Sequence, residues 1–120
     1  MYTLKELEEF SNGKIINGDH NTEITFFSTS RKKHIKGEFY IPFIFKNINR
    51  EVFIIDSVLA GGKGFIINKN SKNYDTIISK AMEINHNICI WLIKDFFKNN
   101  LICYYFYKKI LTFLSFASKI

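Results

Sequence analysis

The chain has 120 residues and a mass of 14.2 kDa, which fits one domain of ordinary size and leaves no room for a second. Hydrophobic residues make up 47% of the sequence and Pro occurs once, so the composition excludes an intrinsically disordered chain. The net charge of +6 favours an anionic partner, which could be a nucleic acid, a membrane surface or a phosphorylated small molecule. A coding bias toward Lys, Asn and Ile would produce the same excess of positive charge.

The first residues of the chain predict a helix. Thr3 and Glu6 have the spacing of a capping box, in which the Thr hydroxyl and the Glu carboxylate each accept the other residue's backbone N–H. Apolar side chains follow at helical spacing, namely Leu4, Leu7 and Phe10. Gly13 is expected to end this helix, because glycine is common directly after a helix C-terminus.

Two short strands are expected next. Residues 14–16 predict a short strand that ends at Asn17-Gly18, a pair typical of a tight hairpin turn, and residues 23–28 would form the second strand of the hairpin. Residues 31–37 read as a basic loop. Residues 38–43 are strand-like, and Pro42 marks the end of that strand or an edge position, because Pro cannot donate to a sheet ladder.

The stretch Gly61-Gly62-Lys63-Gly64 raises the question of a phosphate-binding loop. Such a loop needs a strand before its glycines and a helix after them, together with the pattern GxxxxGK[ST], which the chain lacks. Here the preceding apolar residues have helical spacing, as Val52, Ile55 and Leu59 or as Val52, Ile55 and Val58, and residues 65–68 form an apolar run typical of a strand. The glycines therefore predict a turn from a helix C-terminus into a strand, without an ATP site.

Helix and strand alternate again in the second half. Residues 74–84 predict a helix and residues 87–93 a buried strand, so the chain is expected to form an α/β layer. The last residues are apolar on all sides, which predicts a helix packed on the domain or an aggregation-prone end. Lys108 and Lys109 interrupt that run, and its uninterrupted pieces are shorter than the ~20 apolar residues of a membrane span, so a span is not expected.

Cysteine and histidine indicate neither a metal site nor a nucleophile. The two Cys residues, Cys89 and Cys103, have no partner at a motif spacing, and the charged N-terminus is unlike a signal peptide, so a reduced, cytoplasmic protein is expected. The three His residues, His20, His34 and His86, are too scattered for the spacing of metal ligands.

Three stretches taken together resemble a known family. The segments "TLKELEEFSNGKIINGD", "TEITFFSTSRKKHIKGEFYIPF" and "FIIDSVLAGGKGFII" occur in the order of corresponding motifs in the N-terminal domain of the Mur ligases of peptidoglycan synthesis. Within that family, the likeness is greatest to the ligases that add D-alanyl-D-alanine to UDP-N-acetylmuramoyl-tripeptide. The resemblance implies a small α/β domain over residues 1–95, with short strands alternating with helices. Residues 96–120 depart from the family as a divergent apolar helix or tail.

The resemblance also implies a function. The first domain of these ligases binds the UDP-muramoyl-peptide, whereas ATP and magnesium are held by a central domain that this chain lacks. The chain is thus similar to a truncated or degenerate substrate-binding domain, which binds a UDP-sugar at most and does not ligate alone. One alternative is a split ATP-dependent ligase, completed by domains on another chain. A second alternative is a small basic protein that binds nucleic acid or a membrane surface, although the Lys residues are spread along the chain rather than clustered.

The family's substrate-binding motifs match this chain in part. Ser28, Thr29, Ser30 and Arg31 match a Ser-Thr-Asp-Ser-Arg motif from which the Asp is missing. Hydroxyls in this segment could bond the uracil or ribose, and the Arg guanidinium could bond phosphate. An Arg31 that simply opens a solvated basic loop is the competing interpretation.

The family's second motif, a Gly-Glu-Asn-x-Asp-Gly-His loop, is altered more strongly. Asn47 matches its Asn and Asn49 stands for its Asp, while Phe45, Arg50 and Glu51 replace the first Gly, the later Gly and the His. A loop glycine supplies a positive φ or a close approach, so these replacements are expected to impair ligand binding.

Overall fold

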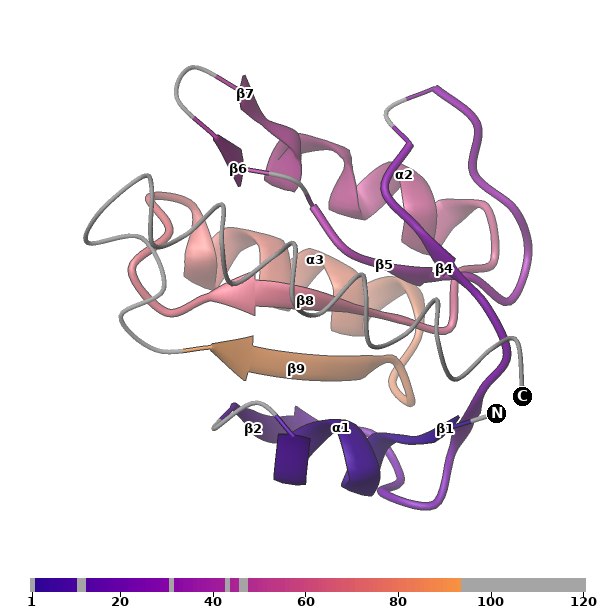
Figure 1. Cartoon of the computed structure of the whole chain (residues 1–120). Coiled ribbons are helices and arrows are strands. Elements are labelled where there is room, and N and C mark those ends of the chain that lie inside the picture. The colour runs from indigo at the N-terminus through magenta and orange to yellow at the C-terminus, as the bar shows by residue number, and fades with distance from the viewer. Residues whose placement is uncertain (1, 11–12, 31, 43, 46–47, 94–120) are drawn as a thin grey trace.

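A computed structural model describes residues 2–10, 13–30, 32–42, 44–45 and 48–93. Its centre is a five-stranded mixed sheet, whose strands can be followed in Figure 1. The strand order is β2-β9-β8-β5-β4. Their bounds are β2 Lys14–Asn17, β4 Phe27–Ser28, β5 Phe39–Tyr40, β8 Gly64–Asn68 and β9 Cys89–Ile93. Strands β4, β5, β8 and β9 pair with one another in parallel, and β2 pairs antiparallel with β9. The expected mixed α/β architecture is therefore confirmed.

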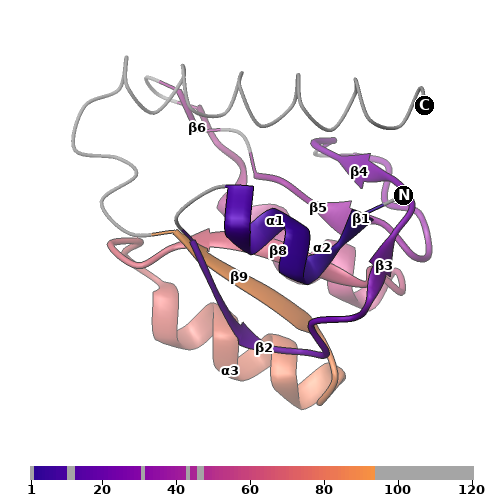
Figure 2. The same cartoon turned by 60° about the horizontal axis from the view of Figure 1, so that its bottom comes forward.

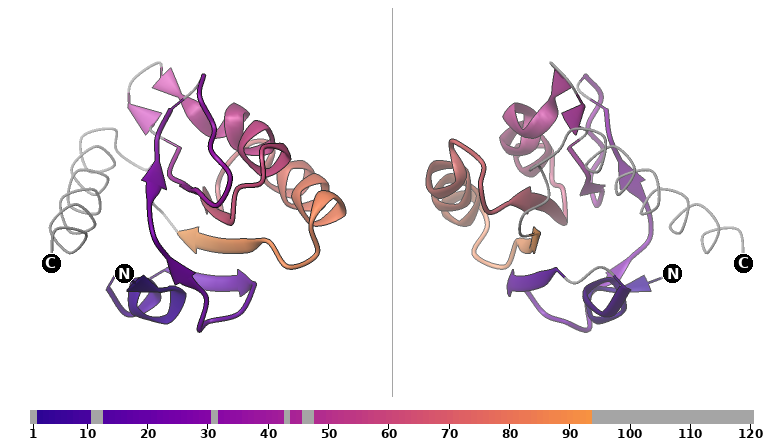
Figure 3. Two further views of the ribbon diagram at one scale, coloured as in Figure 1. Left: turned by 90° about the vertical axis from the view of Figure 1, so that its right-hand side faces the viewer. Right: turned by 60° about the vertical axis from the view of Figure 1, so that its left-hand side comes forward.

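Two helices cover one face of this sheet. After β5 the chain forms a small antiparallel pair, β6 (Ile44–Phe45) and β7 (Ile48–Asn49), and then the 3-10 helix η1 (Arg50–Phe53) and α2 (Ile54–Leu59). The second helix, α3 (Tyr74–Ile84), connects β8 to β9. Crossovers between neighbouring parallel strands share one hand, so both helices lie on the same face of the sheet (Figure 3).

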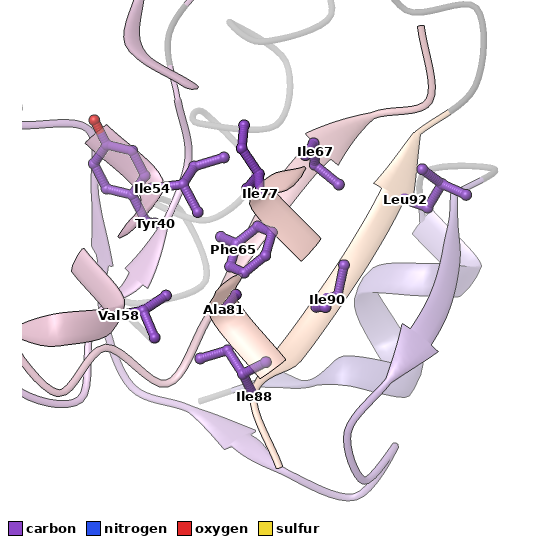
Figure 4. Close-up of a cluster of buried hydrophobic side chains, with 10 residues drawn as sticks. All are labelled: Tyr40, Ile54, Val58, Phe65, Ile67, Ile77, Ala81, Ile88, Ile90 and Leu92. Atoms are coloured by element: carbon purple, nitrogen blue, oxygen red, sulfur yellow. The ribbon is translucent and has the colours of Figure 1, made fainter. Parts of the chain in front are cut away.

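The main core fills the space between these helices and the sheet. Figure 4 shows ten buried side chains pointing toward one another: Tyr40, Ile54, Val58, Phe65, Ile67, Ile77, Ala81, Ile88, Ile90 and Leu92. All residues of β8 and β9 are buried, which explains their continuous apolar runs, because the central strands of a parallel sheet are covered on both faces. Ile77 and Ala81 are one turn apart on α3 and form its buried side.

The N-terminal elements pack beside the edge strand β2 (Figure 2). Here α1 (Leu4–Phe10) follows β1 (Tyr2–Thr3), which pairs antiparallel with β3 (Glu23–Ile24). The capping box is confirmed, since Glu6 N donates to Thr3 Oγ1 and Thr3 N donates to Glu6 Oε1, both at 3.3 Å. The described helix covers Leu4–Phe10, and Gly13, which was expected to end it, is not helical.

The expected hairpin at Asn17-Gly18 is wrong. Strand β2 pairs with β9 instead, and the expected second strand is divided into β3 and β4, which join two different sheets. The Asn17 side chain donates to the carbonyls of His86, at 2.9 Å, and Ile88, at 2.8 Å. The residue that reads as a turn signal therefore fixes the edge strand to the loop before β9.

The expected helix before the glycines is confirmed, but its expected apolar stripe is only partly right. Val58 is buried and Ile55 packs against the core, as expected. Val52 and Leu59 are 64% and 65% exposed, whereas Ile54 and Val58 are buried. Val52 lies in η1, where the chain has about three residues per turn instead of 3.6, so the periodicity counted from it does not describe the buried side of α2.

The turn from helix to strand is confirmed in detail. Gly61 has a φ of +93°, and its N–H donates to Val58 O at 3.0 Å, while Gly62 N donates to Ser57 O at 2.8 Å. These two bonds satisfy the last carbonyls of α2 in the usual manner of a glycine C-cap, and β8 begins at Gly64. The expectations for residues 96–120 and for Cys103 lie outside the described residues. Among the described helices, none is long and apolar enough to cross a membrane.

Candidate functional site

The candidate site lies where the parallel strands β4 and β5 end. Ligands of open α/β sheets bind outside the carboxyl ends of the strands, because loops and helix N-termini meet there. Thr29 and Ser30 directly follow β4, and Arg50 starts η1. The Arg50 guanidinium reaches the segment after β4, where its Nη1 donates to Thr29 O at 2.6 Å.

The first three residues of the matched motif, Ser28, Thr29 and Ser30, lie together at the end of β4. Ser28 Oγ accepts from Ser30 N at 3.3 Å, and Ser30 Oγ accepts from the backbone N–H groups of Lys32, at 3.2 Å, and Lys33, at 3.0 Å. A hydroxyl that accepts backbone bonds keeps its own O–H for donation. Ser28 and Ser30 are only partly buried, so both hydroxyls can donate to a ligand.

The remaining site residues expected from the sequence are not tested by these contacts. Arg31 and Asn47 lie outside the described residues. The backbone of Asn49 belongs to β7, where it pairs with Ile44. Arg50 also lies at this site, beside Thr29, and it was not predicted from the sequence as a binding residue. Its one signal in the sequence was that an arginine stands where the resembling family has glycine.

Tyr40, the last residue of β5, lies next to Arg50. Its ring is buried, and its hydroxyl donates to Arg50 O across a long 3.5 Å. Burial raises the pKa of Tyr40 to about 12, although the positive charge of Arg50 acts in the opposite direction. Tyr40 therefore stays a neutral hydrogen-bond donor at this edge of the sheet at any physiological pH.

The raised pKa of Tyr40 predicts a loss of stability at alkaline pH. Above the ordinary tyrosine pKa of 10.0 the unfolded chain releases a proton that the folded chain keeps until about pH 12, so stability falls as pH rises through this window. We expect the urea midpoint of the parent to fall more steeply between pH 10 and pH 12 than that of Tyr40→Phe. Equal slopes in the two proteins would contradict the assignment to Tyr40.

A second polar cluster connects the basic loop to α2. The carboxylate of Glu38 is fully buried and accepts from Ser57 Oγ at 2.6 Å and from Ile35 N at 2.7 Å, and its Oε2 lies 3.0 Å from His34 Nδ1. Nothing in the sequence pattern distinguished these residues. In serine hydrolases the nucleophile bonds to the histidine, whereas the Ser57 hydroxyl donates to the carboxylate, so the bonds of this cluster differ from those of a catalytic triad.

A cavity of about 260 Å³ lies between η1, α2 and α3. Its lining is Glu51, Val52, Ile55, Ser71, Lys72, Asn73, Thr76, Ile77 and Lys80. Glu51 is buried, and its carboxylate accepts from Ser71 Oγ at 2.7 Å and from Asn68 N at 3.2 Å. These bonds fix the start of η1 to the end of β8, so Glu51 supports the position of its neighbour Arg50.

The described part of the chain contains neither a set of metal ligands nor an activated thiol. No three His, Cys, Asp or Glu side chains there are arranged to hold a metal ion. Burial raises the pKa of the Cys89 thiol, so little of the nucleophilic thiolate forms near neutral pH.

Comparison with protein-family models, curated proteins and solved structures gave no match to this chain. The residues at the carboxyl ends of β4 and β5, together with the motif resemblance, remain as the basis for a function.

Proposed function

We propose that this chain is a binding module for a UDP-sugar, similar to the N-terminal domain of Mur ligases and with a UDP-muramoyl-peptide as its ligand. The observation that carries this proposal is the position of Ser28, Thr29 and Ser30 at the carboxyl end of β4, beside the Arg50 guanidinium. The matched motif thus occupies the edge of the sheet at which open α/β domains bind their ligands.

The chemistry of this edge fits a nucleotide-sugar. Uracil carbonyls, ribose oxygens and a diphosphate all accept hydrogen bonds, and the edge supplies donors: the hydroxyls of Ser28 and Ser30 and the guanidinium of Arg50. Lys32 and Lys33 are exposed immediately beyond it and add positive charge. A ligand with negative charge and many acceptors is therefore favoured over an apolar one.

The glycine turn supports a module that binds without ATP chemistry. Gly61 and Gly62 cap the C-terminus of α2, where the helix presents carbonyl oxygens and negative partial charge. The Lys63 ammonium donates to Glu23 O at 2.8 Å. ATP and magnesium would bind to a further domain, and peptide ligation would require that domain as well.

Titration calorimetry with UDP-N-acetylmuramoyl-tripeptide tests this proposal. We expect saturable binding to the parent, and a loss of roughly 1.5 to 3 kcal/mol in Arg31→Ala, because that side chain offers charge-assisted bonds to phosphate. Lys32→Ala is the matched control: it removes a neighbouring exposed charge, and the expected loss is below about 1 kcal/mol.

The possible outcomes separate the site from the function. Equal affinities for the parent and Arg31→Ala would remove Arg31 from the site. No heat at millimolar ligand would contradict UDP-sugar binding as a whole. Binding of an unrelated duplex DNA or of anionic vesicles with higher affinity would favour the alternative of a small basic surface-binding protein.

A further inference from the structure

Arg50 is placed at the site by the fold and not by its sequence neighbours. Its Nη1 donates at 2.6 Å to the carbonyl of Thr29, a residue 21 positions earlier in the chain. The guanidinium therefore lies against the segment that carries Ser28 and Ser30. In the resembling family this position belongs to glycine, so the motif comparison assigns Arg50 no role in the ligand site.

The Arg50 guanidinium has unused donors. A guanidinium carries five N–H groups, and Nε is buried without a hydrogen-bond partner among the described residues. The histidine–carboxylate contacts within the described residues join His20 to Glu8 and His34 to Glu38, and neither of them involves Arg50. A buried donor on a charged group is costly while it is unpaired, so an acceptor supplied by a ligand is favoured at this position.

The acceptor that suits this position is a phosphate group. Arginine bonds phosphate through two parallel N–H groups, which gives both energy and orientation. The hydroxyls of Ser28 and Ser30 lie on the segment that Arg50 contacts, and both keep an O–H to donate. The Thr29 carbonyl oxygen, which would otherwise repel phosphate, already accepts from Arg50 Nη1.

We propose that Arg50 is a further phosphate-binding residue of this site and contacts the diphosphate of the nucleotide-sugar next to Ser28 and Ser30. This inference rests on the proposed function for the identity of the whole ligand, but its chemistry needs only a diphosphate. Nη1 keeps Thr29 O as its partner, and the phosphate oxygens bond the unpaired Nε–H, which a shift of the guanidinium first exposes because Nε is buried.

The Nε–H resonance of Arg50 in ¹H–¹⁵N NMR spectra of the full chain provides a direct test. The resonance is assigned by its disappearance from the spectrum of Arg50→Lys. Inorganic pyrophosphate and UDP-N-acetylmuramoyl-tripeptide are expected to shift this resonance, whereas uridine is expected to leave it in place. Arg50→Gln should weaken pyrophosphate binding roughly tenfold to a hundredfold. Lys5→Gln removes one exposed charge on α1 and should change the affinity for pyrophosphate by less than about twofold.

The variants distinguish a ligand contact from a structural role. A purely structural Arg50 would lower the affinity for uridine and pyrophosphate together, and that result would overturn the inference. Arg50→Lys keeps the positive charge and one bond to Thr29 O, so this variant is expected to remain folded. Thermal melting of the variant checks that it does. Its pyrophosphate affinity should lie between those of the parent and Arg50→Gln.

Failure of this inference differs from failure of the proposed function. Pyrophosphate that does not bind, that leaves the Nε–H resonance unmoved at saturation, or that binds equally to parent and Arg50→Gln, would overturn the role of Arg50. If pyrophosphate binding depends on Arg50 but the UDP-sugar binds no more tightly than pyrophosphate, the role of Arg50 stands and the proposed function fails.

Discussion

Gly62→Val is expected to unfold most of the protein or to lower its free energy of unfolding by at least about 3 kcal/mol, the upper range for overpacking. A Cβ atom at Gly62 would lie 2.6 Å from Ser57 Oγ and 2.8 Å from Ser57 O. The second of these atoms accepts the Gly62 N–H that caps α2, so the turn cannot open without losing its own bond. Urea unfolding followed by the fluorescence of Trp91, the sole tryptophan, measures the effect.

Two neighbouring variants make this test specific. Gly61→Val places a β-branched residue at a φ of +93°, with an expected cost of roughly 1 to 2 kcal/mol or more. Ala60→Val is the control, because Ala60 is exposed with an ordinary φ of −77°, and its expected change is within about 0.5 kcal/mol. In variants that still fold, the affinity for a UDP-sugar should be unchanged. If Gly62→Val and Ala60→Val melted alike, the assignment of the C-cap would be wrong.

Glu38→Ala is expected to cost about 2 to 6 kcal/mol of stability, because it leaves two donors without an acceptor and each unpaired buried donor costs about 1 to 3 kcal/mol. The fully buried carboxylate accepts from Ser57 Oγ and Ile35 N and contacts His34 Nδ1. Its loss would leave buried donors from the basic loop and from α2 without an acceptor. The urea midpoint, again followed by tryptophan fluorescence, is the measurement.

Controls on the same helix and in the same cluster sharpen this prediction. Asp56→Ala removes an exposed carboxylate from the first turn of α2 and should cost less than about 1 kcal/mol. The double variant Glu38→Ala with Ser57→Ala should lose less than the sum of the two single changes, because the hydroxyl then no longer lacks its acceptor. Additive losses would show that the Ser57–Glu38 bond contributes little.

Part of the candidate site could be predicted from the sequence, because its residues are contiguous. Ser28, Thr29 and Ser30 lie together at the end of β4, as a short motif after a strand must. That they bind a UDP-sugar stays a prediction. Arg50 could not be found in this way, since the bond that joins it to Thr29 spans 21 residues of sequence and depends on how η1 is placed.

The sequence by itself determined the elements whose signals are local. The capping box at Thr3 and Glu6, the bounds of α3 and the glycine turn after α2 depend on residues within a few positions of one another, and all three are present in the structure. Such signals depend on backbone geometry and side-chain periodicity, which hold wherever the segment is placed.

Only the tertiary structure decided which segments meet. It paired β2 with β9 instead of the expected hairpin partner, through Asn17 and a carbonyl 71 positions away. It also selected the buried side of α2 and placed Ser57 against Glu38, 19 positions apart. Local patterns cannot determine these contacts, because strand pairing and burial depend on which distant surfaces exclude water together, and several pairings satisfy the same alternation of apolar residues.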